Sequence, residues 1–515
     1  MRSKKWTATE ISETSCRSRS GRKITRARLH ALVFTIFASA SVAMTPPLCA
    51  QQMNRRYSVV VLPPDGGEDS FLAGYLFYAP LTNRGTLGVS ADTSTPGVYN
   101  SYTWTKGRQV DFQPLPQLPN LTGTNTYVNW INQPGFAAGY GTRTDSVSGA
   151  SVDHAAIWTP NGQVFELSTP EGDQSHAVWI NDFGQVSGWI ENSTLDPCAF
   201  GVGLQFQSQA VIWEFGFMQL LGTLGGTNSY GEFINNLGQV SGHSETSTTP
   251  DAVTGCPPID PFIWQNGQMT DINPGNFGGA IGGTNFLNNR GEAVGFGALA
   301  GDTGSHPFLW SQGKLTDLYY VGNLGGTLNS AFTVNERGHV VGASSNASGA
   351  ILAVLWRNGE FTDLSTLSGD DCSEPFFINS QDQIVGISFS CETGVQHAFL
   401  WENGELADLN TLIPSNSGIE LTAAEWINED GEIAAQATLR STGAQAAVLL
   451  IPNGERDSDA KASSAAIKDA ARAAQSDGTQ GQAPKKSGLR INNAGPLNHM
   501  LLRPFSPAML LDKAH

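Results

Sequence analysis

The feature that most restricts the fold of this chain is a short phrase that recurs eight times. It consists of an apolar residue and Asn, two further residues and Gly, then an apolar residue and usually a second Gly. Copies lie at 131–139, 180–188, 234–242, 287–295, 334–342, 378–386 and 427–431, with a degenerate copy at 81–89. The copies are roughly fifty residues apart, and a unit of that size must stack on its neighbours to bury its sheet.

A second phrase, apolar residues ending in Trp, alternates with the first. It ends at Trp104, Trp158, Trp213, Trp264, Trp310, Trp356 and Trp401, and a copy without Trp covers 446–451. A turn follows, often Asn-Gly as at 161–162, 266–267, 358–359 and 403–404, which favours a type I′ hairpin. The Asn-x-x-Gly phrase predicts another hairpin turn with glycine in the left-handed region. Each module is therefore predicted to hold four short strands in two hairpins.

Two further patterns predict how these modules assemble. Adjacent bulky residues precede the module Asn, as at 130–131, 179–180 and 426–427, which indicates strands buried on both faces. Residues 57–62 look like the strand that follows a Trp phrase, and 446–451 look like the strand that precedes one; their pairing would hide the exposed edges. We expect an all-β, eight-bladed β-propeller over 51–452, with seven blades as the alternative. Which link crosses between blades stays open.

The phrases His-Pro-Phe-Leu-Trp at 306–310 and His-Ala-Phe-Leu-Trp at 397–401 closely resemble the extracellular HAF repeat of bacterial proteins. The Leu-Gly-Gly-Thr links at 224–227 and 324–327 and the Ile-Asn-x-x-Gly turns fit the same family. The resemblance covers roughly 57–451 and implies a bacterial secreted or cell-surface repeat protein. The family brings no catalytic residues to carry over. The degenerate first copy and the missing last Trp depart from its pattern.

The two ends of the chain differ from the repeats. Basic residues between 22 and 28, an apolar run over 29–42 and a cleavage point near 48–50 predict that residues 1–50 are a signal peptide. The apolar run is shorter than the roughly 20 residues of a membrane helix, so we expect a secreted or periplasmic chain with no membrane span after cleavage. Residues 453–515, rich in Ala, Ser, Gly, Gln and Lys, are predicted to be a disordered tail.

Four cysteines remain after the predicted cleavage: Cys198, Cys256, Cys372 and Cys391. An even number in an exported chain predicts two disulfides. Cys372 and Cys391 are equidistant from the turn at 381–382, so a regular hairpin would place them opposite each other. Cys198 and Cys256 fall in equivalent loops of successive modules. The predicted pairs are therefore 198–256 and 372–391, and none of the cysteines has the spacing of a zinc site.

Charge and motifs restrict the function. The net charge is −17, and most Lys and Arg residues lie before 51 or after 452, so the repeat region should repel nucleic acid. No nucleophile elbow, phosphate-binding loop or zinc-protease phrase occurs. His154, His306 and His397 share one position of the repeat, as do Asp271, Asp317, Asp363 and Asp408, and both sets are interpreted as structural. We expect no cofactor, no metal and no catalytic residue.

Two carboxylates nevertheless suggest an alternative. Glu232 and Glu425 each stand three residues before a module Asn, and both would face a central channel if those strands line it. Glycosidases need two carboxyl groups about 5–9.5 Å apart, and an eight-bladed channel should be wider. An extracellular polysaccharide hydrolase or lyase therefore remains the second hypothesis.

The leading hypothesis comes from loop length. The stretch from module Gly to Trp is longer at 139–158, 188–213 and 242–264 than at 295–310, 342–356 and 386–401. Insertions in neighbouring repeats gather on one face, where repeat proteins tend to bind. Trp189, Phe200 and Phe206 lie in these stretches. The sequence thus predicts a monomeric binding module for an extracellular protein or glycan.

Overall fold

The computed structural model describes residues 57–74, 78–119, 121–145, 150–170, 174–198, 206–273 and 277–453. The chain divides into two units, 1–52 and 53–515, and all described residues belong to the second. The predicted signal peptide and all but the first residue of the predicted tail lie outside the described residues. Within the described ranges, no helix is long and apolar enough to cross a membrane.

The regular secondary structure of the described residues is almost entirely β-strand, as predicted, and the strands form four-stranded antiparallel meanders. The first three meanders contain β2 (Gly66–Leu72), β3 (Thr86–Thr93), β4 (Tyr99–Thr105) and β5 (Arg108–Asp111); β6 (Leu121–Ile131), β7 (Ala137–Asp145), β8 (Ser151–Trp158) and β9 (Val164–Glu166); and β10 (Ser175–Ile180), β11 (Val186–Leu195), β12 (Phe206–Glu214) and β13 (Phe217–Leu220).

The next two meanders make one eight-stranded sheet, because a single parallel residue pair, Ile259 with Ile281, joins them. Their strands are β14 (Ser229–Ile234), β15 (Val240–Glu245), β16 (Ile259–Gln265) and β17 (Gln268–Asp271), then β18 (Gly278–Leu287), β19 (Ala293–Leu299), β20 (Ser305–Ser311) and β21 (Lys314–Asp317). Short 3-10 helices follow β19 and β21: η1 (Ala300–Asp302) and η2 (Leu318–Tyr320).

The remaining strands form three further four-stranded sheets. They are β22 (Gly325–Val334), β23 (Val340–Asn346), β24 (Ile351–Arg357) and β25 (Glu360–Asp363); β26 (Cys372–Ile378), β27 (Ile384–Phe389), β28 (Gln396–Glu402) and β29 (Glu405–Asp408), followed by η3 (Leu409–Thr411); and β30 (Ile419–Ile427), β31 (Ile433–Leu439) and β32 (Gln445–Pro452), to which β1 (Tyr57–Val61) adds.

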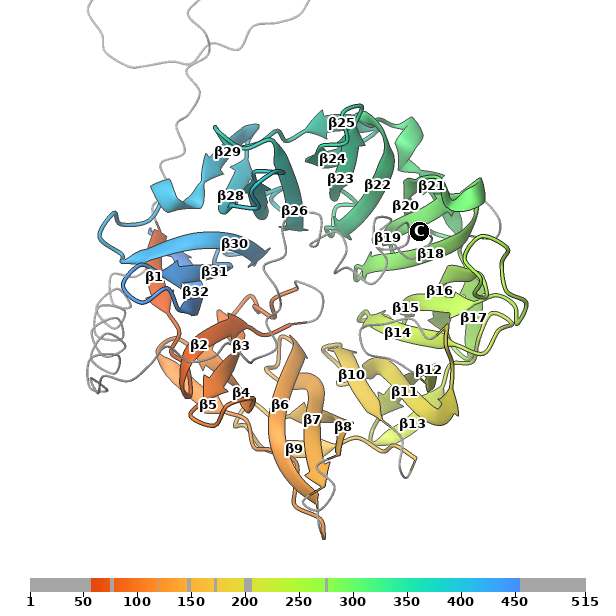
Figure 1. Cartoon of the computed structure of the whole chain (residues 1–515), viewed down its shortest axis with the longest axis horizontal. Helices are drawn as coiled ribbons and strands as arrows, with labels where there is room; N and C mark the ends of the chain where they lie inside the picture. Colours follow the sequence, from red (N-terminus) through yellow and green to blue (C-terminus); the bar gives the residue numbers. More distant parts are fainter. Residues whose placement is uncertain are drawn as a thin grey trace, which may run out of the picture. The chain divides into compact units, whose positions relative to one another are not determined.

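The two ends of the repeat region pair as predicted. β1 runs antiparallel to β32, with Tyr57 opposite Pro452 and Val61 opposite Val448. Figure 1 shows the sheets of the second unit arranged around a common centre. Each sheet begins with the strand before the module Asn, so the Gly-Gly link at 224–227 crosses from one sheet to the next. This observation settles which link joins the modules.

The turns follow the predicted chemistry with one exception. Asn266-Gly267 has φ angles of 52° and 85°, as a type I′ turn requires. Asn161 is not among the residues with positive φ, so the type I′ prediction is wrong at this turn. Pro160 precedes Asn161, and its ring fixes φ near −65°. The chain instead closes a longer turn, in which Gly162 N–H donates to Thr159 O.

The innermost strands carry a feature that the sequence did not reveal. The register shifts once just before the module Asn in β6, β10, β14, β18, β22, β26 and β30, which is the signature of a β-bulge. The bulge brings a backbone carbonyl of the innermost strand close to the second strand of the same sheet, at the position of the second Gly of the phrase. A Cβ on Gly139 would stand 1.9 Å from Tyr127 O, and one on Gly342 would stand 2.1 Å from Ser330 O. The recurring second Gly therefore serves close backbone packing.

Candidate functional site: an axial pocket

The module asparagines connect neighbouring sheets near the centre of the ring. The Nδ2 group of each donates to the backbone oxygen of the equivalent residue in the next sheet, at 2.9–3.1 Å, for Asn132, Asn181, Asn235, Asn288, Asn335 and Asn379. Asn428 continues the series by donating to Thr82 O at 3.0 Å, so the hydrogen bonds return to the first copy. The Oδ1 atom of each accepts within its own turn, as Asn181 does from Gln185 N–H. One amide thus shapes the turn and joins the sheets.

The residue after each module Asn forms a second series. In most copies its side-chain oxygen accepts a hydrogen bond from the backbone N–H at the same position of the preceding copy. The acceptors are Gln133, Asp182, Asn236, Asn289, Glu336, Glu429 and Asn83, at 2.9–3.2 Å. We call these residues, with Ser380, the polar rim. The last bond, from Glu429 N–H to Asn83 Oδ1, again joins the last copy to the first.

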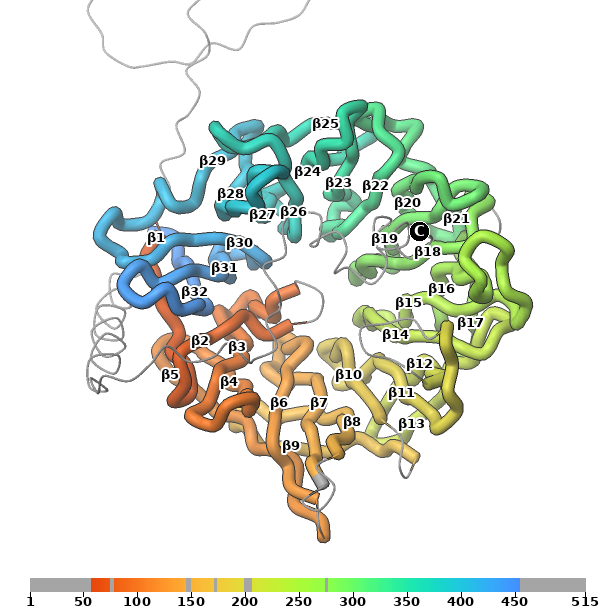
Figure 2. The backbone as a smooth tube through the Cα atoms, in the orientation of Figure 1, coloured from red at the N-terminus to blue at the C-terminus, as the bar shows by residue number. Residues whose placement is uncertain are grey.

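The polar rim surrounds a cavity of about 400 Å³ at the centre of the ring, which we call the axial pocket. Five aromatic side chains line its inner part, one each from β6, β10, β18, β26 and β30: Trp130, Trp179, Phe286, Phe377 and Trp426. They pack closely on one another: the ring centroids of Trp130 and Trp179 are 3.6 Å apart and those of Phe377 and Trp426 are 3.4 Å apart. The tube in Figure 2 shows the inner strand ends converging on this centre.

Tyr78 packs against aromatic residues of the pocket lining. Its side chain is 2% exposed and meets the rings of Trp179, Phe233 and Trp426 edge-on, at centroid distances of 5.7–6.2 Å. Its hydroxyl donates to Asn285 O at 2.8 Å and lies 3.1 Å from Phe332 O, on two different strands. Tyr78 lies outside every repeated phrase, and we find no sequence signal that would have identified it.

Within the described lining of the axial pocket, every charged side chain is a carboxylate: Asp182, Glu336 and Glu429. The second oxygen of Asp182 accepts from Asn236 Nδ2 at 2.9 Å. Desolvation by burial, and then the negative charges of Glu292 and Glu429, raise the pKa of Glu336, although the N–H of Asn289 and the positive charge of Arg290 oppose that shift. The pocket therefore concentrates negative charge over an aromatic base.

The two carboxylates proposed from the sequence lie elsewhere. Glu232 and Glu425 are the extra residues at the bulges of β14 and β30. At the same bulge position, Asn129 and Asn285 hydrogen-bond to the next sheet, so this position faces a neighbouring sheet. Glu232 is buried, with Oε1 3.7 Å from His243 Nδ1. Burial raises the pKa of Glu425 to about 8.

The aromatic residues proposed for the long loops have different positions. Trp189 lies within β11, is 7% exposed and stacks on His176 at 4.2 Å, so it belongs to the interior. Phe206 begins β12 and is half-buried, and Phe200 lies outside the described residues. The long loops lie at the ends of the strands opposite the Asn turns, so they belong to the face opposite the axial pocket.

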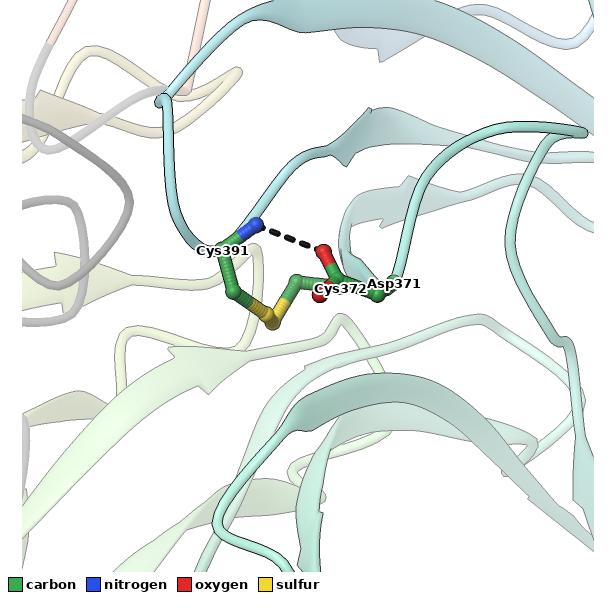
Figure 3. Close-up of side chains that lie close together, drawn as sticks. All are labelled: Asp371, Cys372 and Cys391. Carbon is green, nitrogen blue, oxygen red and sulfur yellow. Dashed lines mark hydrogen bonds between the residues drawn. A yellow bond between two sulfur atoms is a disulfide. The ribbon is translucent and has the colours of Figure 1, made fainter.

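Both predicted disulfides are present. Cys198 bonds to Cys256 between neighbouring sheets, and Cys372 bonds to Cys391 within one hairpin, each with a Cα separation of 5.6 Å. Cys372 is not directly opposite Cys391 but opposite Phe389, because the turn register and the bulge each displace the pairing by one residue. In Figure 3, Asp371 lies beside the second bridge and accepts the N–H of Cys391 at 2.7 Å. Since both sulfurs are bonded to each other, this group offers no thiolate to a metal.

The recurring histidines and aspartates have structural partners. His306 Nδ1 lies 2.8 Å from Asp317, His154 lies 3.2 Å from Glu166 and His397 lies 3.1 Å from Asp370. The repeated aspartates accept a backbone N–H two residues further on, at 2.8–2.9 Å, as at Asp271, Asp317, Asp363 and Asp408. This is the local turn bonding expected of Asp.

The sequence matches no protein family model and no curated protein. Similar solved structures include an acylaminoacyl peptidase from Pyrococcus horikoshii, at 10% identity and a TM-score of 0.38, over 72% of this chain and 59% of that one. TolB from Acinetobacter baumannii matches at 10% identity and 0.31, over 72% and 80% of the two chains. The polysaccharide lyase Uly1 matches at 10% identity and 0.32, over 77% and 99%. This chain thus spans less than two thirds of the peptidase.

Proposed function

We propose that this chain is an exported, monomeric binding module of the HAF-repeat type, built as a closed eight-bladed propeller that holds its ligand in the axial pocket. The eight-blade count is supported by seven Asn turns and the equivalent turn at Thr82, and by the hydrogen bonds from Asn428 and Glu429 back to Thr82 and Asn83. Export is supported by two disulfides, which persist in oxidising compartments. The partner is an extracellular glycan, protein or small solute.

One observation carries the binding function: a preformed pocket with an aromatic base and a polar rim contributed by all eight copies. Pockets of several hundred Å³ with apolar walls and a few fixed polar groups are typical ligand sites. The rim is preorganised, because its oxygens are held by backbone N–H groups of the neighbouring copy. A rigid site orders few side chains on binding, which favours affinity.

The pocket can be tested by filling it. Asn83 lines the axial pocket, whereas its exposed neighbour Arg84 stands at the apex of the same turn. An array of extracellular glycans, proteins and small solutes is probed with the full chain, with Asn83→Trp and with Arg84→Trp as the matched control. We expect Asn83→Trp to abolish the binding that Arg84→Trp retains. Equal binding by all three proteins would refute the pocket as the site and favour the long-loop face.

A second candidate is hydrolysis or elimination at the same pocket. It is favoured by the raised pKa of Glu336 near Glu429, since a raised pKa suits a general acid. Both carboxylates already accept backbone N–H groups, which favours a positioning role. Release of reducing ends from a polysaccharide panel, lost in Glu336→Gln but not in Glu360→Gln on the exposed strand β25, would establish the enzyme. Binding without product release would exclude it for that panel.

A further inference from the structure

The charge of the axial pocket restricts the class of ligand that it can bind. Asp182, Glu336 and Glu429 lie at three separate points of the polar rim. Their carboxylate oxygens accept hydrogen bonds from backbone N–H, amide or hydroxyl groups rather than from a Lys or Arg side chain. No basic residue is among the described lining residues that would neutralise this charge by direct contact, and a concave site focuses such a field.

Three arginines directly follow rim residues in the sequence: Arg84, Arg290 and Arg337. Arg84 is exposed, and the charge of Arg290 acts on Glu336. Arg290 Nη2 lies 3.4 Å from Glu292, and Arg337 Nη1 lies 3.5 Å from Asp382, with both arginine side chains about half exposed at 51% and 53%. Arg290 also donates to the backbone oxygen of Glu336 at 3.2 Å. None of the three arginines is among the residues that line the pocket.

The aromatic base of the pocket is the second feature that restricts the ligand class. Three indoles and two phenyl rings line the pocket. Trp130 stacks on Trp179 and Phe377 stacks on Trp426, so each of these rings has at most one face left for a ligand. Such a face carries negative partial charge that attracts cations. Methylated or alkylated ammonium groups combine a positive charge with an apolar surface, so they match carboxylates and aromatic rings together. An anionic ligand would be repelled, and a neutral ligand would leave the rim charge unused.

We infer that the axial pocket binds an alkylated ammonium group. This inference rests on the proposed function, because it names the ligand class of the same site. The ammonium group sits at the centre of the pocket against the rings of Trp130, Trp179 and Trp426, with its charge within the ring of the three carboxylates. The rest of the ligand, which is attached to the ammonium nitrogen, extends out of the pocket through the polar rim.

The test compares two probes of the same shape. Choline and 3,3-dimethylbutan-1-ol differ at one atom, which is a charged nitrogen in the first and a carbon in the second. Each is titrated into the full chain by isothermal calorimetry and by quenching of tryptophan fluorescence. We expect choline to bind at least tenfold more tightly and to weaken as salt is raised. Equal affinity of the two probes would overturn the inference about ligand class, whereas it would leave the pocket as a binding site.

Single substitutions test whether the rim carboxylates cause the preference for choline. Glu336→Gln and Glu429→Gln should each lower choline affinity about three- to tenfold and leave 3,3-dimethylbutan-1-ol unchanged, while Glu360→Gln should change neither. If choline does not bind, but another ligand from the array is lost in Asn83→Trp, the ammonium inference is wrong and the binding function stands. If no ligand is sensitive to Asn83→Trp, the proposed pocket function itself fails.

An ammonium group can arrive on a free solute or on a lipid, and a further arm separates these sources. The full chain is sedimented with phosphatidylcholine vesicles in the presence and absence of free choline. Vesicle binding that choline displaces would assign a lipid headgroup. Choline binding without co-sedimentation would assign a small solute.

Discussion

Tyr78 should be a large single contributor to the stability of the centre of the ring. Replacing it by Phe removes a hydroxyl that meets the buried carbonyls of Asn285 and Phe332, and we expect a loss of about 1–2 kcal/mol. Replacing it by Ala also removes a buried ring packed against Trp179, Phe233 and Trp426. Large-to-small changes of this kind cost about 3–5 kcal/mol.

The assay is urea unfolding of the full chain, followed by tryptophan fluorescence and by far-ultraviolet circular dichroism. The unfolding midpoint should fall in the order wild type, Tyr78→Phe, Tyr78→Ala, with unchanged slope. Tyr320, which is 81% exposed, provides the matched control, and Tyr320→Ala should shift the midpoint very little. If Tyr78→Ala were no more destabilising than Tyr320→Ala, Tyr78 could not be the side chain that fills the centre.

Three further predictions test other parts of the fold. Gly342→Ala should cost at least about 2–4 kcal/mol by urea unfolding, because its Cβ would lie 2.1 Å from Ser330 O, whereas the exposed Ser348→Ala should be near neutral. Replacing Cys198 and Cys256 by Ser should lower the free energy of unfolding by about 1 kcal/mol more than replacing Cys372 and Cys391, because the two bridges span 58 and 19 residues. Equal losses of stability in thermal unfolding would contradict this prediction. Burial raises the pKa of Glu425 to about 8, so folding favours its neutral form and this contribution is lost as pH rises from about 4.5 through 8. Glu425→Gln should therefore be more stable than wild type by about 1–2 kcal/mol at pH 8, after allowance for partial solvent contact, and equally stable near pH 4. Parallel stability curves would show that folding does not raise the pKa of Glu425.

The sequence predicted those features of the fold that depend on local rules. Asn-Gly turns, left-handed glycines and the repeat period follow from backbone conformation and from the need of a small unit to stack. The pairing of 57–61 with 448–452 was also accessible, because both ends carry half of a recognisable module. The type I′ turn predicted at Asn161 was wrong for an equally local reason, because the ring of Pro160 fixes its φ angle.

The axial pocket could not be predicted from local features of the sequence. Its walls combine Trp130 with Trp426, and its closing bond joins Asn428 to Thr82 across 346 positions of the chain. Each of these residues looks like one more copy of a structural phrase. Only their convergence on one centre turns them into a site.

The bulges explain why the candidate carboxylates were misplaced. One extra residue changes which side chains of a strand face each side. It places Glu232 and Glu425 at the position from which Asn129 and Asn285 reach the neighbouring sheet. The sequence by itself thus determined the repeat, most of its turns and the pairing of its two ends, since these follow from short-range backbone preferences and recognisable half-modules. Tertiary structure alone decided what faces the centre, because that depends on strand register and on contacts between residues far apart in the chain.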